Sequence, residues 1–146
     1  MKQSKDYVPM IIKAVLDTNV FISGIFWEGN YCSQIINMWR DNNLLLVSSL
    51  EIIQELVKTL SNFKIKMPSE MIKGWQTMIF ENSTIVAPAE RFKTVKEDPD
   101  DDKFLEAAYA GKANYIITQD KHLLKLKEFR GITIIKPEEF LKLKII

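Results

Sequence analysis

Short apolar runs alternate with amphipathic segments along most of this chain. Each run is rich in β-branched residues and is bounded by polar or turn-forming residues. Such runs predict buried strands, because a continuous apolar stretch of this length is typical of a strand that is covered on both faces. The predicted strands are residues 11–16, 44–47, 84–87, 115–118 and 132–135.

Between these runs, apolar residues recur at helical spacing. In residues 50–60, isoleucines and leucines fall three and four positions apart and form one apolar face. Ser48 and Ser49 precede this segment as candidate N-caps, and Gly111 is placed to end a later helix. The predicted helices are residues 33–40, 50–60, 70–82 and 102–110, followed by a last helix that starts at Pro137.

This alternation of strands and helices predicts an α/β fold with a central, mainly parallel sheet of about five strands and helices on both faces. In such sheets, ligands bind beyond the carboxyl ends of the strands, near the point where the strand order reverses. Side chains that follow the predicted strands are therefore the first candidates for chemistry.

The composition is that of one globular domain. The chain has 146 residues, of which 47% are hydrophobic and 27% charged, with a net charge of +1. We assign residues 1–10 to a short N-terminal tail and residues 11–146 to a single domain. The one cysteine, Cys32, excludes an internal disulfide, and no apolar run approaches the roughly 20 residues of a membrane span. These features predict a soluble cytoplasmic protein without a membrane partner.

Acidic residues stand where the predicted strands end. Asp17 directly follows the first strand, and Asp120 lies just beyond the fourth. Glu55 lies in the helix after the second strand. Asp102 begins a later helix and is the last residue of an acid-rich segment, residues 97–102. Taken singly, each acid has a structural interpretation as a helix cap, a turn residue or a solvated helix position.

Taken together, these acids favour a metal site. Two bare carboxylates about 4 Å apart repel each other by roughly 4 kcal/mol at an effective dielectric constant of about 20. Several carboxylates in one cleft therefore need protons or cations between them. Mg²⁺ and Mn²⁺ prefer carboxylate and water oxygens, and they bind phosphate esters and activate water for hydrolysis.

The order and spacing of several segments resemble the PIN domain family. The segments are DTNVFIS from Asp17, IIQELV from Ile52, DDDKFLEAA from Asp100 and YIITQDKHLL from Tyr115. The resemblance covers residues 11–137 and is greatest to small bacterial and archaeal PIN proteins that are often paired with an antitoxin. It implies a three-layer α/β/α sandwich.

The resemblance also implies site residues. The acidic metal site would consist of Asp17, Glu55, Asp102 and Asp120, with Glu55 as a direct or water-mediated ligand. The family's supporting positions match Asn19, which would brace the first aspartate, and Thr118, just before the last one. Asp98 and Asp101 are further or substitute ligands, and which of the crowded aspartates turns inward stays open.

By this resemblance, the protein is a nuclease that cleaves single-stranded RNA with one or two Mg²⁺ or Mn²⁺ ions. An activated water would attack the phosphodiester in line and leave a 5′-phosphate and a 3′-hydroxyl. The expected partners are RNA, a cognate antitoxin and a second copy of the chain. Lysines that would grip the phosphate backbone are Lys64, Lys66, Lys121 and Lys125.

The alternative is a PIN-like RNA-binding or protein-assembly module with weak or no cleavage activity. Metal-dependent hydrolysis that is lost in Asp17→Asn would separate the two. Other chemistries lack the residues they need: His122 is the single histidine, which excludes a two-histidine ribonuclease, and the chain has no P-loop or GxGxxG motif. A phospho-receiver domain would need an aspartate after the third strand, where Pro88 and Ala89 stand.

Overall fold

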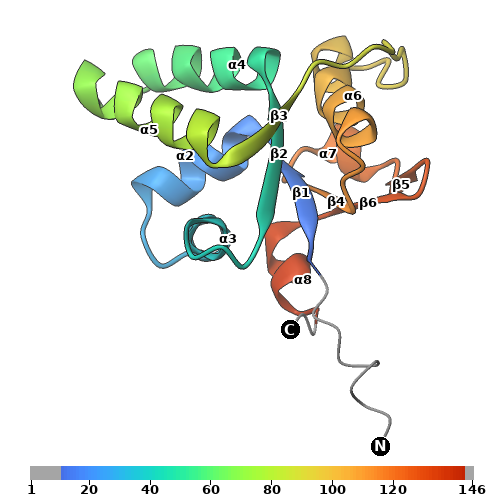
Figure 1. Cartoon of the computed structure of the whole chain (residues 1–146), viewed down its shortest axis with the longest axis horizontal. Coiled ribbons are helices and arrows are strands. Elements are labelled where there is room, and N and C mark those ends of the chain that lie inside the picture. The colour runs from blue at the N-terminus through green and yellow to red at the C-terminus, as the bar shows by residue number, and fades with distance from the viewer. Residues whose placement is uncertain (1–10, 144–146) are drawn as a thin grey trace, which may run out of the picture.

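The structure is a computed structural model that describes residues 11–143, so the predicted tail, residues 1–10, lies outside the described part (Figure 1). The strands are β1 (Lys13–Leu16), β2 (Leu45–Ser49), β3 (Ser83–Val86), β4 (Tyr115–Ile117), β5 (Glu128–Phe129) and β6 (Ile132–Ile135). The helices are α2 (Thr18–Phe26), α3 (Tyr31–Arg40), α4 (Leu50–Ser61), α5 (Ser69–Glu81), α6 (Asp102–Ala110), α7 (Lys121–Leu124) and α8 (Pro137–Leu141), and a 3₁₀ turn, η1 (Pro99–Asp101), precedes α6. Over residues 11–143, no helix has the length and apolar character that a membrane span requires.

The six strands form one sheet in the order β3-β2-β1-β4-β6-β5. All neighbouring pairs are parallel except β5 with β6. The predicted α/β fold with a mainly parallel sheet is confirmed, and the sheet has one strand more than the pattern indicated. The added strand, β5, is two residues long and pairs with β6 across a turn at Arg130 and Gly131. So short a strand has no periodicity that a sequence pattern can reveal.

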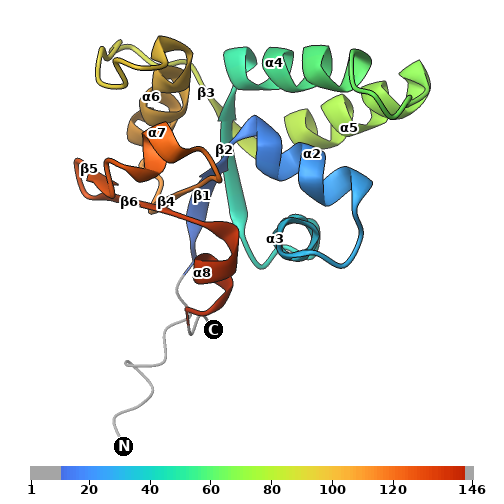
Figure 2. The same ribbon diagram turned by 180° about the vertical axis from the view of Figure 1, so that it is seen from behind.

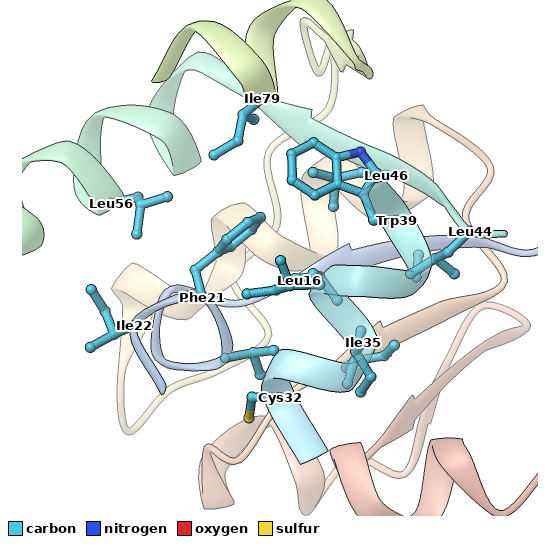
Figure 3. Close-up of a cluster of buried hydrophobic side chains, with 14 of the residues drawn as sticks. Leu16, Phe21, Ile22, Cys32, Ile35, Trp39, Leu44, Leu46, Leu56 and Ile79 are labelled. Carbon is cyan, nitrogen blue, oxygen red and sulfur yellow. The ribbon is translucent and has the colours of Figure 1, made fainter. Parts of the chain in front are cut away.

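Helices cover both faces of the sheet, as Figures 1 and 2 show: α2, α3, α4 and α5 lie on one face, and α6 and α7 lie on the other. A separate apolar cluster fills each of the two interfaces. In the first cluster, the side chains of Phe21, Trp39 and Leu46 converge (Figure 3). The Trp39 indole N–H donates to the backbone carbonyl of Asn82 at 2.9 Å, and Cys32 is a buried free thiol in the same cluster.

Helix α2 was not among the predicted helices. It begins directly after β1, and Asp17 is its N-cap, whose carboxylate accepts the backbone N–H of Val20. Gly24 lets α2 approach α3 closely. A Cβ at this position would lie 2.4 Å from Ile36 Cδ1 and 3.0 Å from the backbone of Cys32. The tight contact fixes α2, which begins next to Asp17, against α3.

Candidate metal centre

The two central strands bring an aspartate each to the same edge of the sheet. β1 and β4 are parallel neighbours, with Leu16 opposite Ile117. The next strand in sequence after β1 lies on one side of it, and β4 lies on the other, so the strand order reverses here. Ligands bind at this point in open α/β sheets. Asp17 follows β1 and donates its backbone N–H to Ile117 at 3.2 Å, and Asp120 follows β4.

A buried threonine links these two aspartates. The Thr118 hydroxyl donates a short hydrogen bond to Asp17 Oδ2 and accepts the backbone N–H of Asp120 at 2.9 Å. Asp17 Oδ1 accepts the N–H of Val20 at 3.0 Å, and Asp120 Oδ1 accepts the N–H of His122 at 2.7 Å. Both carboxylates therefore cap helices, α2 and α7 respectively, and these hydrogen bonds restrict their orientation.

Asp98 and Asp101 complete an acidic cluster with Asp120. One carboxylate oxygen from each of the three residues lies within 4.8 Å of the other two. The turn η1 causes this proximity, since the Asp101 N–H donates to the Asp98 carbonyl at 2.9 Å and closes the chain on itself. Asp101 is buried, while Asp98 and Asp120 are half-buried. Each of these acids thus comes within reach of a shared ion.

Burial and mutual repulsion raise the pKa of two acids in this region. The pKa of Asp101 is raised to about 8, first by burial, then by the contact with Asp120 and by the charges of Asp98 and Asp17. The pKa of Asp17 is raised to about 6, mainly by burial, although the hydrogen bond from Thr118 lowers it. At neutral pH the cluster therefore holds a proton unless a cation replaces it.

The cluster has the donors that a hard divalent cation requires. Asp101 Oδ2 is buried and has no hydrogen-bond partner among residues 11–143. A buried carboxylate oxygen without a partner is costly, and a cation beside it would remove that cost. The three acids offer only carboxylate oxygens, the ligands that Mg²⁺ and Mn²⁺ prefer. The residues present therefore fit such an ion.

Glu55 adjoins this cluster through Thr18 and a buried lysine. Glu55 Oε2 accepts a short hydrogen bond from the Thr18 hydroxyl, and Oε1 lies 2.5 Å from Lys103 Nζ. Lys103 also contacts Asp100, at 2.8 Å from its carbonyl oxygen and 3.3 Å from Oδ2. Burial lowers the pKa of Lys103, but Glu55 and Asp100 outweigh it and the net shift is upward, so the ammonium stays charged.

Comparison of the sequence with known families identifies the family of this chain. A profile of the PIN domain matches residues 13–122, a range that contains all of the acids described above. The chain belongs to the PIN domain family. It is 31% identical over 125 residues to the uncharacterized protein MJ1680 of Methanocaldococcus jannaschii, an alignment that covers 80% of this chain and 76% of that protein.

Several solved structures share the fold of this PIN domain. VapBC2 from Rickettsia felis, bound to a DNA fragment from their promoter, superposes with a TM-score of 0.57 at 15% identity over 86% of this chain and 98% of that chain. VapBC-1 from nontypeable Haemophilus influenzae superposes with a TM-score of 0.59 at 17% identity, over 87% of this chain and 99% of that chain. FitAB bound to an IR36 DNA fragment superposes with a TM-score of 0.56 at 12% identity, over 85% of this chain and 94% of that chain. At these identities the likeness establishes the fold.

Within this PIN domain, Asp102 faces away from the acidic cluster. Its Oδ1 accepts the backbone N–H groups of Thr94 at 3.1 Å and Val95 at 2.9 Å. Glu106, one turn further along α6, accepts a backbone N–H of the same loop. These two acids hold the 91–96 loop against α6. The expectation that Asp102 joins the other acids is thus corrected: the carboxylate of Asp101 lies near those of Asp98 and Asp120, while the 91–96 loop binds that of Asp102. Consecutive helical residues point about 100° apart, so the two side chains diverge.

Lys103 and Thr18 are residues that the sequence analysis missed. The one signal in the sequence is the position of Lys103 in the first turn of a helix, where a positive charge opposes the helix dipole and needs a specific partner. Asn19 differs from expectation in another way. Its side chain is exposed, and its backbone N–H, together with that of Val20, favours the charged form of Asp17.

The lysines predicted to contact RNA lie at two separate places. Lys121 and Lys125 are exposed at α7, next to the acidic cluster, and Lys125 Nζ lies 2.5 Å from the Glu97 carboxylate. Lys64 and Lys66 are exposed in the connection between α4 and α5. Figure 1 shows this connection at the outer end of both helices, away from the sheet. The structure therefore separates Lys64 and Lys66 from the acids.

A cleft of about 480 Å³ lies between α4, α6 and the 91–96 loop and reaches the turn η1. Arg91 lines it and is paired with Glu51 at 2.6 Å and Glu106 at 2.7 Å. Lys93 and Lys96 also line it, are exposed, and form no ion pair with another residue in the range 11–143. A second cleft, of about 310 Å³, shares lining residues with the first and continues along α4 past Glu55. The two clefts form a path beside the acidic cluster, and Lys93 and Lys96 on this path have no ion-pair partner in the described part of the chain.

Proposed function

We propose that this PIN domain is a metal-dependent endoribonuclease that acts on single-stranded RNA in the cytoplasm. The observation that carries the proposal is the convergence of one carboxylate oxygen each from Asp98, Asp101 and Asp120 within 4.8 Å. Asp101 also has a buried oxygen, Oδ2, without a hydrogen-bond partner among residues 11–143. Acids at this spacing repel each other when ionised, so the arrangement gains most from a bound cation. Membership of the PIN domain family supports the same reading.

In this proposal, Asp98, Asp101 and Asp120 hold Mg²⁺ or Mn²⁺. A bound divalent ion lowers the pKa of water and offsets negative charge on the phosphodiester oxygens. Asp101 would bind the ion in its ionised form, because a positive charge would take the place of the proton that burial otherwise favours. Asp17 stands beside Asp120, held by the Thr118 hydroxyl, and adds a further carboxylate toward the same space.

The substrate chemistry follows from the charges around the path. Lys93 and Lys96 on the 91–96 loop, and Lys121 at the start of α7, are exposed near the acids. Lysines contact phosphate oxygens without reading base identity, so these side chains favour a nucleic-acid backbone of unspecified sequence. Lys125 would join them once its pair with Glu97 opens.

We further propose two protein partners. The structural relatives are VapBC and FitAB assemblies, and by analogy a cognate antitoxin would cover the cleft and give the protein a toxin role. A homodimer would use α5, whose Met71 and Phe80 are exposed, at 53% and 50%. Met67, Trp75 and Met78, in or next to the same helix, pack against the core of the chain and would not contribute to that surface.

The test is cleavage of mixed single-stranded RNA by the purified chain in EDTA, Mg²⁺ or Mn²⁺. We expect cleavage with either ion and none in EDTA or in Asp101→Asn. Asp100→Asn is the matched control, because Asp100 lies in the same turn but its side chain is 80% exposed. Full activity in Asp101→Asn would contradict the proposal. RNA binding without cleavage in either metal would favour the binding-module alternative.

A further inference from the structure

A lysine ammonium occupies the part of the site around Glu55. We propose that Lys103 is a resident cation that neutralises Glu55, so that this PIN domain binds a single divalent ion per chain, at Asp98, Asp101 and Asp120. The inference rests on the proposed metal-dependent function. It specifies which acids hold the ion, which acid has its negative charge neutralised by a lysine, and how many ions the site accepts.

The ammonium of Lys103 is fully satisfied where it lies. It has three N–H donors, and three acceptor atoms surround it: Glu55 Oε1 at 2.5 Å, the Asp100 carbonyl at 2.8 Å and Asp100 Oδ2 at 3.3 Å. The Lys103 side chain is 7% exposed, whereas that of Glu55 is 28% exposed. The positive charge is therefore buried beneath its acidic partners and is not a mobile surface group.

Both carboxylate oxygens of Glu55 already have a partner, and one of these partners is a cation. Oε1 is paired with Lys103, and Oε2 accepts the hydroxyl proton of Thr18. Among residues 11–143, the acids whose oxygens converge within 4.8 Å are Asp98, Asp101 and Asp120, and Glu55 is not one of them. The carboxylate of Glu55 is thus balanced separately from the cluster, although both lie at the same end of the sheet.

A second divalent ion at Glu55 would have to displace the ammonium or lie next to it. Displacement would leave a buried charge without its acceptors, and a charge left alone in this way is strongly unfavourable. Placement beside the ammonium would bring like charges together in a partly buried site. Both routes are disfavoured for the same reason, so Lys103 excludes the second ion while it remains paired.

Glu55 is then a positioning residue and not a metal ligand. Its bridge to Lys103 joins α4 to α6 across the end of the sheet. Its contact with Thr18 supports the residue next to Asp17, the N-cap of α2. Removing the lysine charge should therefore free Glu55 as an additional anionic ligand beside Asp17.

The test is calorimetric titration of the full chain with Mn²⁺, which counts bound ions without reference to activity. We expect one ion per chain in the wild type and two in Lys103→Met, the second binding more weakly. Lys103→Arg, which keeps the charge, should return the count to one. The double variant Lys103→Met/Glu55→Gln should also bind one, because it removes the charge that the second ion would balance.

Lys125→Met is the matched control. It breaks a surface ion pair, Lys125 to Glu97 at 2.5 Å, that is as short as the pair between Lys103 and Glu55. It should leave the count at one. Two ions in the wild type would overturn the inference without any variant, as would one ion in a folded Lys103→Met. Absence of Mn²⁺ binding in the wild type would remove the metal site itself, and with it the proposed function, so the two failures are distinguishable.

Discussion

The carboxylates of Asp101 and Asp102 belong to consecutive residues and serve different sides of the same helix start. Asp101 approaches Asp98 and Asp120, whereas Asp102 accepts two backbone N–H groups of the 91–96 loop. At Asp101, repulsion from the neighbouring carboxylates favours a bound cation. The carboxylate of Asp102 is satisfied by the protein alone. Two chemically identical side chains thus have different partners because they point about 100° apart.

Alanine at each of these positions should therefore give opposite results. Asp101→Ala is expected to abolish Mn²⁺ binding and leave the fold intact. Asp102→Ala should keep Mn²⁺ binding but lower the free energy of unfolding by about 1–3 kcal/mol, because two loop N–H groups lose their acceptor. Calorimetry and urea unfolding measure the two effects. Loss of Mn²⁺ binding in Asp102→Ala alone would restore the original sequence assignment.

Thr118→Val tests the link between the two strand-end aspartates. The substitution keeps the shape of the side chain but removes the hydroxyl that donates to Asp17 and accepts from Asp120. We expect a loss of about 1–3 kcal/mol in unfolding free energy and a further rise in the pKa of Asp17, since this hydrogen bond lowers it. The pKa is measured by carboxyl-carbon NMR. Thr118→Ser keeps the hydroxyl and should behave like the wild type.

Metal-free protein should lose stability as the pH rises. The folded-state pKa values of Asp101, about 8, and Asp17, about 6, exceed their ordinary value of 3.8. Above pH 3.8 the folded state retains protons that the unfolded state has lost, so the contribution is fully present below that pH. It falls as the pH passes through about 6 for Asp17 and about 8 for Asp101. Melting temperatures in EDTA, compared with those of Asp101→Asn, measure it.

The Asp101→Asn variant should have the flatter pH profile, because it lacks the group with the larger shift. At the alkaline end it should melt about 2–4 °C above the wild type if the lost repulsion contributes about 1 kcal/mol. Mn²⁺ should raise the melting temperature of the wild type more at pH 8 than at pH 5.5, because protons compete with the ion. If the melting temperatures of the wild type and Asp101→Asn changed with pH in parallel, the pKa of Asp101 would not be raised.

Lysines lining the cleft should matter more for RNA than lysines at the outer end of α4. In an Asp101→Asn background, Lys93→Gln/Lys96→Gln should weaken binding to a fluorescent single-stranded RNA. It should also reduce the slope of log affinity against log salt by about 0.7 for each lost phosphate contact. Lys64→Gln/Lys66→Gln is the charge-matched control and should leave the slope unchanged. If Lys64→Gln/Lys66→Gln weakened RNA binding more than Lys93→Gln/Lys96→Gln, the RNA would bind along the outer end of α4.

The sequence alone determined the layered α/β fold and the edge of the sheet at which the acids gather. Apolar runs marked the main strands, and Ser49 caps α4 as its position predicted. Asp17 and Asp120 followed their strands, so the parallel order of the sheet was enough to bring them together. These features are local, because a strand, a cap or a strand end is specified by residues a few positions apart.

Tertiary structure alone decided which acids meet and which are balanced elsewhere. Residues 101–108 are buried throughout, so no alternation of exposed and buried positions indicated whether Asp101 or Asp102 joins the acidic cluster. The packing of α6 against the sheet and α4 set that rotation. It also brought Lys103 to Glu55, a pairing between distant residues of two helices that no local pattern encodes. Which carboxylate is free to hold an ion depends on that packing, since charge balance in a buried site is a property of the assembled neighbours.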